Sequence, residues 1–292
     1  LSPTPVSSQR IHLAEVPVPT TTRQIPAETL TLGHGFLAVF TRSILVEQTT
    51  PVTFVISDAV SIIGNITFDD YDLDASDLGG NLTWIEPSDV SQVEHYNVYF
   101  ARRCNVSSEL SVQVSDDSDV GQLPYCEVTF FDTRPLGVSE TVVPPETPLG
   151  NFTHLLIYAN SSLAEQTIPT VHEIFDMSAS ASLIVFVDKD LDESELGGQI
   201  TWQAPSDPSR LQDYVVSLSN DQMGLSRIDL GVAPGEILNV AAETAMVKYV
   251  LVYTRSMLVE QTTPISFNIV DSIASVSNIT FPDFDLDETD VG

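Results

Sequence analysis

The chain has 292 residues, of which 41 are acidic and 11 basic, so its formal net charge at pH 7 is -30. This length allows two or three domains, and a hydrophobic content of 42% is enough to build their cores. The few basic residues exclude a nucleic-acid-binding protein, which must neutralise phosphates, and no apolar run reaches the roughly 20 residues of a membrane-spanning helix.

Residues 43–58, SILVEQTTPVTFVISD, are the first of three copies of one segment. The segment returns as SMLVEQTTPISFNIVD at residues 256–271, and a looser copy, SLAEQTIPTVHEIFD, lies at residues 162–176. Self-similarity of this kind is typical of proteins built from tandem repeats. We call the SxLVEQTT part of this segment the EQTTP turn.

Each copy is followed by a second shared stretch that is rich in aspartate. It reads NITFDDYDLDASDLGG from residue 65, LIVFVDKDLDESELGG from residue 183 and NITFPDFDLDETDVG from residue 278. The repeat distances predict a partial unit at residues 1–57, whole units at 58–176 and 177–271, and the opening segment of a further unit at 272–292. Residues 1–57 match the later part of a unit because RIHL at 10–13 aligns with RIDL at 227–230.

Short apolar runs between these landmarks predict strands. VTFVI at residues 52–56, THLLIYA at 153–159 and YVLVY at 249–253 are rich in β-branched and aromatic residues and are bounded by turn-forming residues. No apolar 3.6-residue period persists for a helix of normal length. The predicted fold class is therefore all-β, with tandem Greek-key β-sandwich domains.

The strand pattern resembles that of fibronectin type III domains. LTWIEPSD at residues 82–89 and HYNVYFA at 95–101 are similar to that family's B-strand Trp, the Pro after it and the C-strand Tyr-x-Val, and ITWQAPSD at 200–207 repeats the pattern before DYVVSLS at 213–219. The acidic stretches and the EQTTP turns depart from it and look more like tandem repeats of large surface proteins of single-celled eukaryotes. Both resemblances imply a non-enzymatic scaffold or adhesion module.

Trp84 and Trp202 stand at equivalent positions in two units. We predict that both indoles are buried between the sheets, because each is followed closely by a Pro that ends the strand. The alternative is an exposed platform on which a sugar stacks.

The aspartate-rich stretches are candidate calcium sites. Their residues alternate with apolar ones, so in an extended segment three carboxylates would share one face, and calcium binds six to eight oxygen ligands. The alternative is a solvated acidic loop that keeps the surface soluble. The candidate ligands are Asp70, Asp72, Asp74 and Asp77; Asp188, Asp190, Asp192 and Glu195; and Asp283, Asp285, Asp287 and Asp290.

Cysteines and sequons predict an extracellular or cell-surface protein. Cys104 and Cys126 lie in a stretch that only the first whole unit contains, and we predict a disulfide between them, with two free thiols as the alternative. Six Asn-x-Ser/Thr sequons predict N-linked glycans; the alternative is that they only reflect strand-edge composition. The sequons are at Asn65, Asn81, Asn105, Asn151, Asn160 and Asn278.

No catalytic motif is present in the sequence, and the carboxylates that could act as a catalytic pair recur in every copy, so we predict that the chain is not an enzyme. The predicted function is a glycosylated structural protein that associates with itself to build an extracellular fibril or surface appendage. Either the polypeptide continues, or neighbouring protomers complete each other by strand exchange. The alternative is a monomeric adhesion or receptor ectodomain that binds a separate ligand.

Overall fold

The computed structural model describes residues 1–4, 9–103 and 125–292, and these residues contain strands and no helix. The all-β fold class is therefore confirmed. The strands are β1 (Phe36–Val39), β2 (Val52–Val55), β3 (Thr67–Phe68), β4 (Asp77–Thr83), β5 (His95–Arg103), β6 (Tyr125–Pro135), β7 (Glu140–Pro148), β8 (His154–Asn160), β9 (Thr170–Glu173), β10 (Ser182–Asp188), β11 (Glu195–Gln203), β12 (Asp213–Ser219), β13 (Ile228–Ala233), β14 (Ile237–Ala245), β15 (Tyr249–Arg255) and β16 (Ile265–Asn268).

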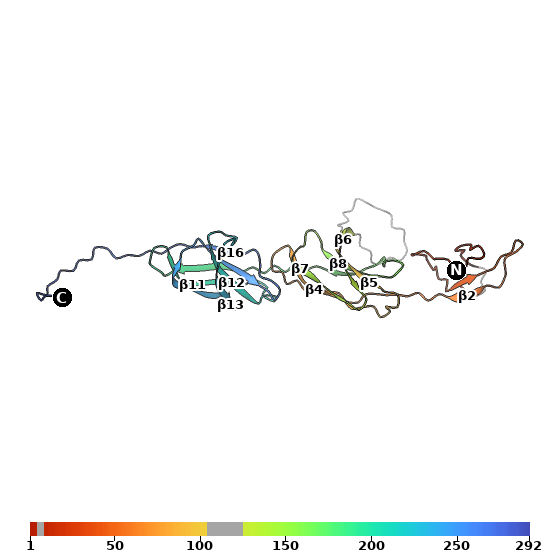
Figure 1. Ribbon diagram of the computed structural model, residues 1–292, viewed down its shortest axis with the longest axis horizontal. Coiled ribbons are helices and arrows are strands. Elements are labelled where there is room, and N and C mark those ends of the chain that lie inside the picture. The colour runs from red at the N-terminus through yellow and green to blue at the C-terminus, as the bar shows by residue number, and fades with distance from the viewer. Residues whose placement is uncertain (5–8, 104–124) are drawn as a thin grey trace. The chain divides into compact units, whose positions relative to one another are not determined.

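The strands form five sheets (Figure 1), and neighbouring strands such as β1 and β2, β10 and β11, and β5 and β6 pair antiparallel. The sheet orders are β1-β2, β3-β4-β7, β6-β5-β8-β9, β10-β11-β14 and β13-β12-β15-β16. The first three sheets come from the N-terminal part of the chain and the last two from the C-terminal part. Within each part the strand order is not sequential, so the chain crosses from one sheet to the other several times.

The chain divides into two compact units that interleave along the sequence. Unit 1 contains Leu1–Ile66, Thr83–Glu140 and His154–His172, and unit 2 contains Thr67–Leu82, Thr141–Thr153 and Glu173–Gly292. Unit 2 thus joins the first aspartate-rich stretch to the whole C-terminal part of the chain. The domain boundaries drawn from sequence periodicity stay predictions.

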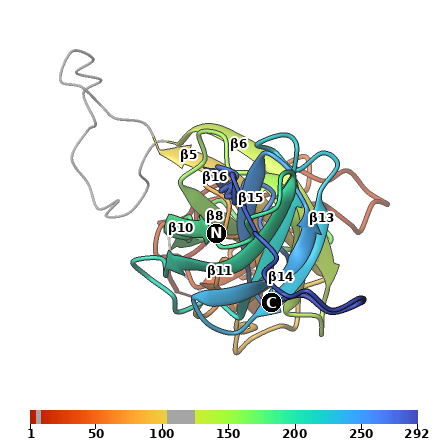
Figure 2. The same ribbon diagram turned by 90° about the vertical axis from the view of Figure 1, so that its left-hand side faces the viewer.

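The two C-terminal sheets of unit 2, of which strands β10, β11, β13, β14, β15 and β16 are labelled in Figure 2, enclose one hydrophobic core. Sheet β10-β11-β14 contributes residues such as Phe186 and Ile200, and sheet β13-β12-β15-β16 contributes residues such as Val216 and Val252. Strand β10 alternates between buried and exposed positions, as a strand with one face against a core should. Strands β12 and β15, the central pair of their sheet, are buried along almost their whole length, because one face lies in this core and the alternate residues Val215, Leu251 and Tyr253 form a second buried cluster.

Both tryptophans are core residues, as predicted from the sequence. Trp202 and Trp84 are each only 4% exposed. The Trp202 ring meets the Tyr214 ring edge-on with 5.2 Å between centroids, and Trp84 meets Tyr96 in the same way at 5.7 Å. These edge-to-face contacts link the strand after the aspartate-rich stretch to the strand that follows it in each copy.

Unit 1 contains the sheet β6-β5-β8-β9 and the β1-β2 hairpin. Tyr99 on β5 contacts Phe130 and Tyr158 edge-on, so aromatic residues join the three strands on one face. The stretch found only in the first whole unit is flanked by strands, because β5 ends at Arg103 and β6 begins at Tyr125. Cys104 and Asn105 lie outside the described residues, and the disulfide with Cys126 stays a prediction.

Candidate functional site

The first acidic block (residues 70–77) is held in shape by its own aspartates. The Asp72 N–H donates to Asp70 Oδ1 at 3.1 Å, and the Asp74 N–H donates to Asp72 Oδ1 at the same distance. Gly79 on β4 donates its N–H to Asp70 Oδ1 at 2.9 Å. Each carboxylate therefore folds back onto the backbone two residues later, so the aspartates first determine the path of the chain.

The second acidic block (residues 188–195) repeats these bonds. The Asp190 N–H donates to Asp188 Oδ1 at 3.1 Å, the Asp192 N–H donates to Asp190 Oδ1 at 3.2 Å, and Gly197 donates to Asp188 Oδ1 at 2.9 Å. In the third block (residues 283–290), Asp285 and Asp287 make the corresponding bonds at 3.0 and 2.9 Å. The alternating aspartates thus encode one local conformation three times.

Two groups of carboxylates in the described residues lie close enough to hold one cation. In each group every member offers an oxygen within 4.8 Å of the others. The groups are Asp72, Asp74 and Glu146, and Asp190, Asp192, Glu195 and Glu243. Among the predicted ligands, Asp70, Asp77 and Asp188 lie outside them, as do Asp283, Asp285, Asp287 and Asp290.

Glu146 and Glu243 were not predicted from the sequence. They come from β7 and β14, which are far along the chain from the aspartates they meet. A signal for them does exist, because VVPPET at residues 142–147 aligns with NVAAET at 239–244 and places a Glu at the same position of both units.

Burial, hydrogen bonding and neighbouring negative charge raise the pKa values of several carboxyl groups in and beside these clusters. Burial raises the pKa of Asp70 to about 6, and the charge of Asp72 adds to the effect. Burial, followed by the charges of Asp72 and Asp74, raises the pKa of Glu146. The pKa of Glu195 is raised chiefly by a side-chain hydrogen bond with Glu243. Each cluster would therefore be stabilised by a bound proton or a cation.

The first acidic block is also the receptor for an EQTTP turn. Asp74 is buried, and two consecutive threonines of this turn donate hydrogen bonds to its carboxylate. Thr262 donates its N–H and its hydroxyl to Asp74 Oδ2 at 2.5 and 3.0 Å. Thr263 donates its N–H to Asp74 Oδ1 at 3.1 Å, and its hydroxyl also donates to that oxygen. One carboxylate thus receives four hydrogen bonds, which bind the turn without a cation.

The same turn also donates hydrogen bonds to backbone carbonyls of the block. Gln261 donates its side-chain N–H to the Leu73 carbonyl at 2.9 Å, and the Ser256 hydroxyl donates to the Tyr71 carbonyl at 2.6 Å. These two carbonyls stand two residues apart, beside the buried Asp72 and Asp74. The turn therefore donates hydrogen bonds to three acceptors of the block: the Tyr71 carbonyl, the Leu73 carbonyl and the Asp74 carboxylate.

Leu258 at the tip of the turn packs where the receptor has a glycine. A Cβ added to Gly79 would lie 2.9 Å from Leu258 Cδ2 and 3.0 Å from Pro145 Cα. A side chain at this position would press on both the Leu258 side chain and the backbone of Pro145, so the glycine allows both to approach closely. The receptor therefore combines an apolar floor of Gly79 and Pro145 with the acceptor Asp74.

Arg210 adds a contact at the edge of the receptor. Its guanidinium lies 4.9 Å from the centroid of the Tyr71 ring, donates to the Tyr71 hydroxyl at 3.0 Å and pairs with Asp69 at 2.5 Å. This cation–π and ion-pair contact lies at the surface, so we expect it to contribute about 1 kcal/mol or less.

The EQTTP turn has the same backbone conformation in all three copies, which are residues 43–50, 161–168 and 256–263. The N–H of its serine donates to the carbonyl three residues later at 3.0 Å from Ser43, 3.1 Å from Ser161 and 3.0 Å from Ser256. The motif's glutamate is paired with an arginine in two copies, Glu260 with Arg227 and Glu47 with Arg10. The turn is therefore formed by its own bonds, whether or not a receptor lies against it.

Four of the described sequon asparagines have exposed side chains, and Asn160 is half-buried at the end of β8. The exposed ones are Asn65, Asn81, Asn151 and Asn278. Asn81 points outward from β4, between the buried Gly80 and Leu82.

No protein-family model and no curated protein sequence matches this chain. Among the described residues there is also no helix that is long and apolar enough to cross a membrane.

Proposed function

We propose that the chain is a non-enzymatic structural repeat protein that builds an extracellular fibril or surface appendage. The observation that carries this proposal is the seating of the 256–263 turn on the first acidic block, which lies more than 180 residues earlier in the sequence. Turn and block belong to successive copies of the repeat, and both motifs recur along the chain. Because the two motifs of this contact recur along the chain, the same contact can join each repeat to the next, as in proteins built from stacked repeats.

The sheet orders support the proposed fibronectin type III-like fold of the repeats. Three strands in one sheet and four in the other, with the order β13-β12-β15-β16 for the second, agree with the arrangement that the Trp and Tyr-x-Val motifs imply. Such modules serve as spacers and scaffolds when they occur in tandem. The absence of a catalytic motif from the sequence is in keeping with that use.

We propose that the exposed sequons carry N-linked glycans and that the protein is extracellular or at the cell surface. Exposure of Asn65, Asn81, Asn151 and Asn278 supports this, because the transferred glycan needs an accessible asparagine. Intact-mass measurement before and after enzymatic glycan removal tests it. An unchanged mass of material from the native source would contradict it.

We also propose that calcium binds the cluster of Asp190, Asp192, Glu195 and Glu243. All four offer an oxygen within 4.8 Å of the others, and the hydrogen bond with Glu243 that raises the pKa of Glu195 is one that a bound cation would replace. Carboxylate clusters of this kind suit calcium at extracellular, millimolar concentrations.

Negative-stain electron microscopy of native material tests the proposed function. Ordered filaments with a short axial repeat are expected. Isolated particles without lateral or end-to-end order would contradict the proposal and favour a monomeric adhesion or receptor ectodomain instead.

A further inference from the structure

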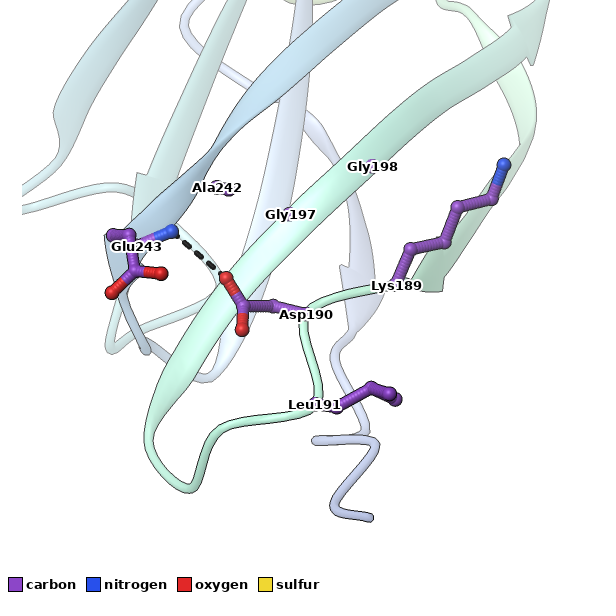
Figure 3. A pocket seen from close by; sticks show the side chains of 7 residues that line it. All are labelled: Lys189, Asp190, Leu191, Gly197, Gly198, Ala242 and Glu243. Atoms are coloured by element: carbon purple, nitrogen blue, oxygen red, sulfur yellow. Dashed lines mark hydrogen bonds between the residues drawn. The ribbon is translucent and has the colours of Figure 1, made fainter. Parts of the chain in front are cut away.

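The second acidic block borders a small open pocket. The pocket has a volume of about 290 Å³ and opens to solvent. In Figure 3 the Asp190 carboxylate accepts a hydrogen bond from the Glu243 N–H, and the side chains of Lys189 and Leu191 point away from this pair. The lining residues are Lys189, Asp190, Leu191, Gly197, Gly198, Ala242 and Glu243.

This pocket occupies the same place in its repeat as the receptor that holds Leu258. DLDESELGG at residues 190–198 aligns with DLDASDLGG at 72–80, so Gly197 corresponds to Gly79. The alignment of β14 with β7 makes Ala242 the counterpart of Pro145. The floor on which Leu258 packs in the first copy is thus present in the second copy, with Ala242 in place of the proline.

The pocket is already in the shape of the receptor. The Glu243 N–H donates to Asp190 Oδ2 at 2.8 Å, as the Glu146 N–H does to Asp72 Oδ2 at 2.7 Å. The Leu191 carbonyl accepts a hydrogen bond from the Ala274 N–H at 3.1 Å, and the Leu73 carbonyl accepts one from the Ala179 N–H at the same distance. The backbone around the pocket therefore needs no rearrangement before a turn can dock.

The surroundings of the two blocks differ. Leu73 is fully buried, whereas its counterpart Leu191 is 53% exposed. Asp74 is buried, whereas Asp192 is exposed. The second block therefore presents at its surface the leucine and the acceptor that the docked turn covers in the first.

Residues 43–50 are an exposed copy of the turn that docks. SILVEQTT differs from SMLVEQTT at residues 256–263 only by Ile44 in place of Met257. Leu45, the counterpart of Leu258, is 89% exposed, and Thr49 and Thr50 are exposed as well. Because the turn has its docked conformation already, binding would cost little ordering of the backbone.

We propose that residues 43–50 of a second copy of this chain dock in the pocket of the second acidic block. Leu45 would pack over Gly197 and Ala242, Gln48 would donate to the Leu191 carbonyl, and Thr49 and Thr50 would donate to Asp192. The proposal deepens the proposed function, on which it rests for its biological meaning, by naming the partner and the residues of the contact between protomers.

Two features limit the strength of this contact. Val187 and Lys189 stand where the first copy has Asp69 and Tyr71, so the contact of Arg210 has no counterpart. The net charge of -30 also opposes association until salt screens it, over about 8 Å at physiological ionic strength. We therefore expect weak association, with a Kd of the order of 10–100 µM.

Sedimentation velocity of the full chain over a concentration series tests the proposal. The buffer contains about 0.15 M salt and a chelator, because calcium bound at Asp192 would compete with the threonines of a docked turn. The wild-type chain is expected to associate reversibly. Leu45→Asp and Asp192→Ala, which change exposed side chains on the two sides of the contact, are each expected to weaken association about tenfold or more.

Leu163→Asp is the matched control. Leu163 holds the same position in the remaining copy of the turn and is exposed, but this copy has Ile168 where the docking turn has its second threonine. Without that hydroxyl donor for Asp192 this copy of the turn is not expected to dock. Association of the Leu163→Asp variant is therefore expected to equal that of the wild type. Circular dichroism spectra of all variants are compared to confirm that they fold.

A wild-type chain that stays monomeric at all concentrations would overturn the proposal, and so would association that neither Leu45→Asp nor Asp192→Ala weakens. Loss of association in Leu163→Asp to the same extent would also overturn it. These outcomes are distinct from failure of the proposed function: filaments in native material together with unaffected variants would refute only this contact, whereas specific association without filaments would refute only the fibril.

Discussion

The first and second acidic blocks have nearly the same sequence and the same internal hydrogen bonds, yet one is covered and the other is open. Asp70 and Asp188 hold their blocks with bonds of equal length to a glycine N–H. Among the residues that the structure describes, only the first block contacts an EQTTP turn, and only there are the leucine and the third aspartate buried. The conformation of a block is therefore local, whereas its burial depends on the turn that docks on it.

The largest expected difference between the blocks concerns their third aspartate. Asp74→Ala removes the acceptor of four hydrogen bonds and leaves the Thr262 and Thr263 N–H groups without it, so we expect a loss of about 3 kcal/mol in the free energy of unfolding. Asp192→Ala removes an exposed side chain and should change stability by less than about 0.5 kcal/mol. Urea unfolding of both variants measures this, and equal losses would contradict the comparison.

The second effect concerns pH. Burial raises the pKa of Asp70 from 3.8 to about 6. The folded chain therefore binds this proton more tightly than the unfolded chain, and the contribution of Asp70 to stability is highest below pH 4 and falls as pH rises to about 6. Between pH 4 and pH 7 the loss is about 2 kcal/mol.

Asp70→Asn is expected to reduce this fall in stability by about that amount. Thermal or urea unfolding across the pH range, with the wild type as reference, provides the measurement. A variant whose stability depends on pH exactly as the wild type does would show that Asp70 is not the group responsible.

The third effect separates the two carboxylate clusters by their response to calcium. The Asp74 oxygens already accept four hydrogen bonds, so we expect calcium to prefer the open cluster around Glu243. At about 10 mM calcium and a Kd of about 1 mM, the gain in stability is about 1.4 kcal/mol. Glu243→Gln should abolish this gain, and Glu146→Gln should preserve it. Calcium that leaves the melting temperature of the wild type unchanged would refute the site.

The smallest effect compares two leucines on equivalent turns. Leu258 is 40% exposed and packs against Gly79 and Pro145, so Leu258→Ala should cost about 1 kcal/mol. Leu45→Ala, at a side chain without such packing, should leave the stability of dilute protein unchanged. A cost for Leu45→Ala as large as that for Leu258→Ala would mean that the turn contributes to stability without a receptor.

Part of this site could be predicted from the sequence. The repeats located both the EQTTP turns and the acidic blocks, and the positions of Trp84 and Trp202 predicted their burial correctly. The expected convergence of alternating carboxylates was incomplete, because Asx-type bonds turn the chain at every second residue. Neither Glu146 nor Glu243 was foreseen, since strand pairing across the sheet brings them to the block.

The pairing of turn and block could not be predicted. Asp74 and Thr262 are 188 residues apart, and no local pattern says that two motifs at such a distance touch. Only the tertiary structure places the donors of one copy on the acceptors of the copy before it. The sequence does show afterwards that the same donors and acceptors recur, which is why the observed contact supports the proposal of a second one.

The most direct test of the docked turn is a double-mutant cycle between Asp74 and Thr263. Asp74→Ala and Thr263→Val are measured singly and together by urea unfolding, and Thr263→Val removes the hydroxyl donor while keeping the backbone N–H. We expect a coupling energy of about 1–2 kcal/mol, because the Thr263 hydroxyl donates to the buried Asp74 carboxylate. Losses that simply add would contradict the claim that the acidic block binds the EQTTP turn.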